Sequence, residues 1–179
     1  MSKNIILLVG KSASGKTTIT NSLEKNFGFK SLQSYTTRPK RTTNETGHTF
    51  VTNEEFNNLK DICAYGEFGG YKYCATKEQV DNSDIYVIDA QGVEYFKKYY
   101  HGKRKPRVVY ISISPIKRFI RLVKRDGFKN GLTRWLQDIS HFKGVKKVID
   151  CEIKIKKDNN CPAISEIVHI WERGNNEIR

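Results

Sequence analysis

Apolar residues along this chain form short continuous runs, separated by stretches in which they recur at helical intervals. The runs at residues 4–9, 85–89 and 108–113 are too short for helices and predict buried strands. Between and after them, apolar residues return every three or four positions, which predicts amphipathic helices. Strands that alternate with helices are typical of a parallel sheet covered on both faces.

The helices are expected where apolar residues share one face. A helix over residues 16–27 would bury Ile19, Leu23 and Phe27. Pro115 opens a later helix, because proline is tolerated in a first turn. The other predicted apolar faces are Val93, Phe96 and Tyr100; Ile116, Phe119, Ile120 and Val123; Leu132, Trp135, Leu136 and Ile139; and Ile164, Ile167, Val168 and Trp171.

Two stretches interrupt this alternation. Residues 33–82 are rich in Thr, Tyr, Gly and Asn, with short β-prone pieces such as residues 48–51, and predict an inserted small sheet with a short helix near 53–60. Residues 125–131 read Arg-Asp-Gly-Phe-Lys-Asn-Gly, which predicts a flexible polar loop between two helices. A last strand is expected within residues 148–155.

A phosphate-binding motif follows directly on the first strand. Residues 10–17 read Gly-Lys-Ser-Ala-Ser-Gly-Lys-Thr, a complete G-x-x-x-x-G-K-[ST] sequence between a strand and a helix. The glycines let backbone N–H groups surround an anion, and the helix dipole adds to the attraction. Lys16 is expected on the β- and γ-phosphates of ATP, and Thr17 on Mg²⁺. The expected ATP-binding residues are Gly10, Ser12, Ala13, Ser14, Gly15, Lys16, Thr17 and Thr18.

Composition narrows the classes of function. The chain has 179 residues and suits one domain, and no run approaches the ~18 apolar residues of a membrane helix. Four cysteines without C-x-x-C spacing indicate free thiols of a cytoplasmic protein. Residues 101–157 hold 17 Lys/Arg against four Asp/Glu and so carry the whole net charge of +13. This block favours phosphate clamping and solvated lysines over nucleic-acid binding, which stays an alternative, because aromatic residues do not alternate with the basic ones.

A second cationic segment opens the insert at residues 34–41, which read Ser-Tyr-Thr-Thr-Arg-Pro-Lys-Arg. Arg38 and Arg41 lie three residues apart beside hydroxyl groups. Arginine presents a planar fork that binds two phosphate oxygens at once, so this pair suits a doubly charged phosphate. Taken alone, the segment would equally be a basic surface turn.

Several motifs in one order resemble the guanylate kinase family, over roughly residues 4–140. S-x-T-T-R-x-x-R after the phosphate loop is similar to the family's acceptor-phosphate segment. The further matching stretches are Gly47 with Phe50-Val51-Thr52, Glu54-Glu55-Phe56, Gly70 to Ala75 with Val80, Ile88-Asp89-Ala90-Gln91-Gly92, and Arg121-Leu122 with Arg125 and Arg134.

The resemblance implies a three-layer α/β P-loop kinase with a parallel sheet, ATP and Mg²⁺ as cofactors, and roles for individual residues. Lys16, Arg38, Arg125 and Arg134 are implied to be catalytic, with Arg125 and Arg134 closing over the transferring phosphoryl group. Arg121 is as readily a packing or surface residue as a ligand. The implied acceptor-nucleotide residues are Ser34, Arg38, Arg41, His48, Glu67, Tyr73 and Asp89, and the implied metal residues are Thr17 and Asp89.

Departures from the family pattern concern the acceptor base. Ala64 stands where the family has a glutamate that binds the guanine edge, and Glu67 would substitute only if the local register slips. Ala75 replaces a hydroxyl residue of the family, and His48 replaces a tyrosine. Lys156 or Asn159 falls where the family has an asparagine after its last core strand. A monophosphate kinase is therefore supported more firmly than GMP as its acceptor.

The expected organisation is one kinase domain, with its core in residues 1–32, 83–124 and 132–179, an acceptor-binding insert at 33–82 and a lid at 125–131. The leading hypothesis is phosphorylation of GMP or dGMP by ATP. A kinase for another or modified (deoxy)nucleoside monophosphate is the close alternative. A non-catalytic guanylate-kinase-like binding module is disfavoured, because the phosphate loop is intact.

Overall fold

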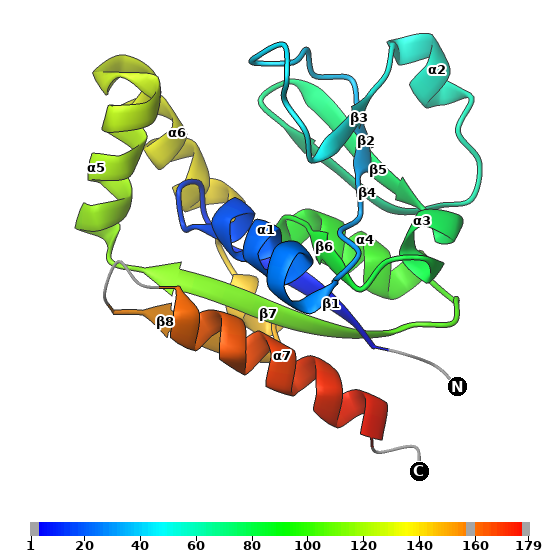
Figure 1. The fold of residues 1–179 in the computed structure, drawn as a ribbon. Coiled ribbons are helices and arrows are strands. Elements are labelled where there is room, and N and C mark those ends of the chain that lie inside the picture. Colours follow the sequence, from blue (N-terminus) through cyan, green and yellow to red (C-terminus); the bar gives the residue numbers. More distant parts are fainter. Residues whose placement is uncertain (1–3, 157–159, 177–179) are drawn as a thin grey trace.

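A four-stranded parallel sheet forms the centre of the computed structural model, which describes residues 4–156 and 160–176 (Figure 1). Its strand order is β6-β1-β7-β8. The strands are β1 (Asn4–Val9), β6 (Ile85–Val87), β7 (Lys105–Ile113) and β8 (Cys151–Ile155). Ser31 forms an isolated parallel bridge with Ile85, so the chain at residue 31 lies beside β6. The predicted parallel α/β architecture is confirmed.

Helices cover both faces of this sheet, and all six residues of β1 are buried. Ile6 and Leu8 face α1 (Lys16–Phe27) and α7 (Cys161–Asn176). There they form one buried hydrophobic cluster with Ile19 and Ile167. The neighbouring residues of β1 point to the opposite face, as successive strand residues do.

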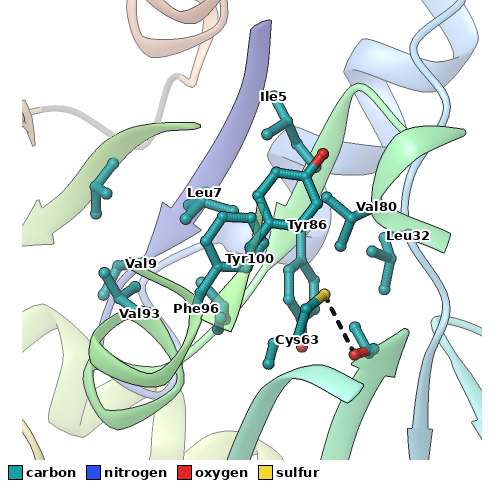
Figure 2. Close-up of a cluster of buried hydrophobic side chains, with 14 of the residues drawn as sticks. Ile5, Leu7, Val9, Leu32, Cys63, Val80, Tyr86, Val93, Phe96 and Tyr100 are labelled. Carbon is teal, nitrogen blue, oxygen red and sulfur yellow. Dashed lines mark hydrogen bonds between the residues drawn. The ribbon is translucent and has the colours of Figure 1, made fainter. Parts of the chain in front are cut away.

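The opposite face packs against α4 (Ala90–Tyr99). Figure 2 shows Val9 of β1 beside Val93 of this helix, in a cluster that also contains Ile5, Leu7 and Phe96. The same cluster reaches into the inserted region, because Leu32, Cys63, Ala64, Ala75 and Val80 belong to it. The insert is therefore anchored through the central core.

A second four-stranded sheet lies above this core, with the order β3-β2-β5-β4 (Figure 1). Its elements are β2 (Ser34–Thr36), β3 (His48–Phe50), α2 (Asn53–Asn57), β4 (Ile62–Phe68), β5 (Tyr71–Thr76) and α3 (Lys77–Asp81). Thr52 and Thr76 begin the two short helices, each through a capping box. The predicted small sheet with a short helix near 53–60 is confirmed.

The prediction of a flexible loop at residues 125–131 was wrong. Helix α5 (Pro115–Asp126) and helix α6 (Phe128–His141) are joined by Gly127 alone, and a short 3₁₀ helix, η1 (Val145–Lys147), follows α6. Gly127 has φ 78°, a conformation that glycine adopts without strain, so one residue is enough to turn the chain between the helices.

The expected buried faces of α5 and α6 were also partly wrong. Ile116 and Ile120 are 72% and 58% exposed, whereas Arg118 and Leu122 are buried. The reason is tertiary: α5 and α6 pack on each other and stand beside the phosphate loop, so the side turned inward carries charge (Figure 1). The other predicted core residues that lie half-exposed are Phe27, Leu136 and Ile139. No helix of the described segments has the length and apolarity needed to span a bilayer.

Candidate active site

The loop at residues 10–17 forms a tight anion cradle between β1 and α1. A methyl group on Gly10 would lie 2.7 Å from Oγ of Ser14 and 2.9 Å from the carbonyl oxygen of Ile111, so a larger residue does not fit. Gly15 and Ala13 have φ of 96° and 61°. The left-handed conformation costs an alanine about 1–2 kcal/mol, so the surrounding contacts must hold this turn in place.

Two polar groups of the cradle are ready to bind an anion. The hydroxyl of Ser14 is buried and has no protein partner. The ammonium group of Lys16 donates to the carbonyl oxygens of Gly10 at 2.5 Å and Lys11 at 3.2 Å. Burial lowers the pKa of Lys16 to about 8, and the nearby guanidinium of Arg125 lowers it too, against the opposing carboxylate of Asp138. These observations fit the phosphates of a nucleotide.

A buried carboxylate that the sequence analysis missed holds the loop from outside. Asp138, on α6, accepts hydrogen bonds from the backbone N–H and the hydroxyl of Ser12, both at 3.0 Å. It also forms an ion pair with Arg118 of α5. Asp138 and Arg118 are 1% and 4% exposed. In the sequence, Asp138 was only a polar residue within an apolar helical pattern.

Arg38 is fixed at the end of β2. Its guanidinium donates to Glu45 through two hydrogen bonds of 2.7 and 3.2 Å, donates to the carbonyl of Pro39, and lies over the ring of Phe50. Burial alone would lower the pKa of Arg38, but the bond to Glu45 and the nearby Tyr73 raise it, so the group is always charged. Glu45 also accepts from the backbone N–H of Arg41 at 2.6 Å.

Polar side chains from three strands of the second sheet meet next to Arg38. The hydroxyl of Ser34 lies 2.9 Å from Nδ1 of His48, and the rings of His48 and Tyr73 pack edge to face at 5.6 Å. Burial and the charge of Arg38 lower the pKa of His48, so its imidazole is neutral near pH 7. Ser34, His48 and Tyr73 therefore present hydrogen-bonding groups without added charge.

Asp89 is the N-cap residue of α4 and lies just after the carboxyl end of β6. Its carboxylate accepts a hydrogen bond of 2.6 Å from the N–H of Gly92. A methyl group on Gly66 would lie 3.0 Å from this carboxylate, so strand β4 approaches it closely because the residue is glycine. Burial raises the pKa of Asp89, against the opposing hydrogen bond from Gly92 and the electrostatic effect of the nearby His141 and Lys16.

The arginines of α5 and α6 face the acceptor segment. Arg125 forms two hydrogen bonds with Asp126, at 3.0 and 2.8 Å, and Arg134 lies 3.5 Å from the same carboxylate. Burial lowers the pKa of Arg41, and the charges of Arg38, Arg134 and Arg125 lower it further. Three chain segments thus direct positive charge at one region.

One cavity of about 180 Å³ joins the loop to the second sheet. Its walls come from the phosphate loop, from β2 to β5, from the end of β6 and from α6. The lining residues are Gly10, Ser12, Lys16, Ser34, His48, Tyr65, Gly66, Phe68, Tyr73, Tyr86, Val87, Ile88, Asp89, Gly92, Asp138 and Phe142.

Some expected site residues lie elsewhere. Glu67 is exposed, is hydrogen-bonded to the hydroxyl of Tyr65, and lines a separate hollow rather than this cavity. Thr17 and Thr18 are exposed in the first turn of α1 and do not line the cavity. Ala64 is 1% exposed and belongs to the apolar core.

An asparagine lies beside the loop at a position that sequence reasoning missed. A methyl group on Gly15 would lie 3.7 Å from both amide atoms of Asn160, whose Oδ1 is buried without a protein partner. Arg121 donates to the carbonyl of Ala13 on the same side at 3.4 Å. The sequence analysis had expected Lys156 or Asn159 here, and Asn159 lies outside the described residues.

The donor set fits a hard divalent cation held mainly by its substrate. Residues 4–156 and 160–176 contain no cluster of three or more His, Cys, Asp or Glu side chains that could hold a metal. Mg²⁺ binds through one or two protein oxygens together with phosphates and water. The hydroxyl of Thr17 and the carboxylate of Asp89 offer such oxygens.

A phosphate cradle at the end of β1 opens into a cavity that it shares with strands of the second sheet, and the cavity lining includes none of Arg38, Arg41, Arg125 and Arg134. A cradle of this kind on a parallel α/β core defines a P-loop phosphotransferase. The family model for guanylate kinase matches residues 2–143. The chain therefore belongs to the guanylate kinase family and is a nucleoside monophosphate kinase of that class.

A solved structure agrees with this fold. The guanylate kinase from Anaplasma phagocytophilum superposes with a TM-score of 0.65 at 19% identity, covering 97% of this chain and 87% of that one. At this identity, the similarity supports the fold alone. Among curated proteins, none matches the sequence significantly.

Proposed function

We propose that this protein transfers the γ-phosphoryl group of ATP to GMP or dGMP, forming ADP and GDP or dGDP. The single observation that supports it best is the shared cavity, whose walls come from both the phosphate loop and the acceptor-side strands. Two nucleotides bound there would meet at their phosphates, and in-line positioning with charge neutralisation is most of what phosphoryl transfer requires.

We assign the donor side to the loop. Backbone N–H groups at the start of α1 and the hydroxyl of Ser14 bind the ATP phosphates, and Lys16 neutralises the β- and γ-oxygens. Asn160 and Arg121 flank Gly15, and we assign them to the base of ATP. Thr17 and Asp89 would hold Mg²⁺, which would neutralise negative charge on the phosphates.

We assign the acceptor side to residues 33–82. Arg38 and Arg41 bind the monophosphate with Tyr73 and His48, while Ser34 and Asp89 face the base. An acceptor phosphate is already ionised, so the reaction needs no general base. Arg125 and Arg134 neutralise the group in transfer when α5 and α6 close over it, and closure excludes water that would hydrolyse ATP.

A kinase for another or modified base is the second candidate, and one observation favours it. Asp89 and Asp138 are the carboxylates that line the cavity among the described residues, and Asp138 is already bonded to Ser12 and Arg118. Asp89 alone remains to bind base N–H groups. A site with fewer fixed hydrogen-bonding partners discriminates less between bases.

The test measures turnover with Mg²⁺-ATP and a panel of ribo- and deoxynucleoside monophosphates, including 5-substituted pyrimidines. We expect GMP or dGMP to give the highest kcat/KM. A tenfold or greater preference for a non-guanine acceptor would overturn the GMP assignment and leave the kinase intact. Absence of turnover with every acceptor, together with absence of ATP binding, would overturn the kinase itself.

A further inference from the structure

Two helices, α5 and α6, hold the phosphate loop through side-chain hydrogen bonds. Asp138 of α6 accepts both hydrogen bonds from Ser12, and Arg121 of α5 donates to the carbonyl of Ala13 at 3.4 Å. Ser12 and Ala13 belong to the phosphate loop itself, and Ala13 has the positive φ of 61°. Ser12 and the strained Ala13 are thus both held by side chains of these helices.

The same two helices carry the arginines that face the acceptor. Arg118, Arg121 and Arg125 follow one another at intervals of three and four residues, so they share one face of α5. Arg134 and Asp138 are four residues apart and share one face of α6. On α5, Arg121 contacts the loop, and Arg125 lies one turn away. On α6, Asp138 contacts the loop, and Arg134 lies one turn away.

The ion pair between Arg118 and Asp138 joins the helices to each other at the point of contact with the loop. Both side chains are buried, and apolar residues of similar volume often stabilise a fold as well or better than such a pair. The charge of Asp138 has a use that an apolar residue would lack, because it accepts both bonds from Ser12.

We propose that Asp138 is a positioning residue that fixes the phosphate loop to the α5–α6 helix pair, so that ATP binding in the loop and closure of Arg125 and Arg134 are coupled. The coupling rests on the proposed function, whereas the restraint on the loop does not. Because helices transmit a shift along their length as rigid bodies, a loop that settles on ATP would move both arginines together.

The decisive variant replaces the ion pair with apolar residues, Arg118→Met with Asp138→Leu, in the full chain. This double variant leaves no buried charge unpaired, so we expect it to fold with wild-type stability in urea. Single Asp138→Asn would leave Arg118 unpaired and lose stability for that reason alone. Asp84→Asn is the matched control, since Asp84 pairs with Arg104 at 3.3 Å before β6, away from the loop.

Three measurements follow: the ATP dissociation constant in the presence of Mg²⁺, kcat and KM for ATP, and amide exchange with and without ATP. In the double variant we expect at least tenfold weaker ATP binding, at least a tenfold drop in kcat, and loss of the ATP-dependent protection of residues 115–141. We expect the Asp84→Asn control to keep the wild-type dissociation constant.

Wild-type ATP binding and kcat in a stable double variant would overturn the proposal. Failure of the proposed function gives a different result. If the wild-type chain bound no ATP, amide exchange in the nucleotide-free protein would still test whether Asp138 restrains the loop. At least tenfold faster exchange at residues 10–17 in the double variant would support this restraint. Equal exchange rates in the two proteins would overturn it.

Discussion

Arg38 and Glu45 form a bidentate ion pair just after β2, with N–O distances of 2.7 and 3.2 Å. The carboxylate holds the guanidinium in one orientation before any substrate arrives. It also accepts the backbone N–H of Arg41 and so draws both arginines of the segment together. A guanidinium that is already oriented loses less conformational entropy when it binds a phosphate.

Arg38→Ala should raise the acceptor KM by roughly 10- to 100-fold, since a charge-assisted hydrogen bond contributes about 1.5–3 kcal/mol. The KM for ATP should stay within twofold. Steady-state kinetics with each substrate varied in turn measures both values. Lys40→Ala is the matched control, because Lys40 is exposed and lies over the same Phe50 ring. An unchanged acceptor KM would remove Arg38 from the acceptor site.

Glu45 should make stability depend on acidic pH. Its hydrogen bond to Arg38 and that to the N–H of Arg41 lower its pKa from 4.5 to about 2, despite partial burial. The folded pKa is below the unfolded one, so this stabilisation is complete above about pH 4.5 and is lost as pH falls toward 2. Urea unfolding between pH 7 and pH 3 should show a shallower loss of stability in Glu45→Gln than in wild type. Parallel curves for the two proteins would contradict this assignment.

Lys16→Ala should lower kcat by roughly 10²- to 10³-fold or more, because the ammonium group neutralises charge on the transferring phosphates. The fold should survive, since the side chain bonds only to carbonyl groups of its own loop. Circular dichroism and kinetics on the same preparation separate the two effects. Lys25→Ala, on the exposed end of α1, should behave as wild type.

Gly66→Ala should disturb Asp89 without touching the phosphate loop. The added methyl group would lie 3.0 Å from the carboxylate, which would have to shift by a few tenths of an ångström. We expect the acceptor KM to rise several-fold while the ATP dissociation constant is unchanged. If both constants stay at wild-type values, Asp89 does not contribute to acceptor binding.

Glu67→Ala tests whether the resemblance-based role for Glu67 applies to this chain. Glu67 is exposed and hydrogen-bonded to Tyr65, so its loss should leave the KM for GMP within twofold. The same substrate panel used for wild type provides the measurement. A tenfold rise for GMP, with other acceptors unaffected, would place Glu67 on the guanine base.

Local patterns predicted the elements that position the site. The apolar run before Gly10 and the helix from Lys16 appear as β1 and α1 with their expected bounds. The capping box at Thr52, which begins the predicted helix near 53–60, depends likewise on residues three positions apart. In each case the interactions that determine the conformation lie within a few residues of one another, so the sequence displays them directly.

The helices after Pro115 show the opposite. Apolar spacing predicted Ile116 and Ile120 as buried, whereas the buried side carries Arg118. Periodicity identifies a helix face but not what covers it. Here a charged partner, Asp138, lies on the neighbouring helix, and its position depends on the turn at Gly127.

The eight-residue phosphate motif determined, without any three-dimensional information, a tight glycine turn and a helix start directly after the first strand, because its glycines act through adjacent peptide groups. From this turn the sequence predicts an anion site. Only the tertiary structure decided that Asp138 holds Ser12, since these residues are 126 positions apart. It also decided that Glu67 points away from the cavity while Gly66 faces Asp89. Contacts of this kind depend on how sheets and helices pack, and no neighbouring residue records them.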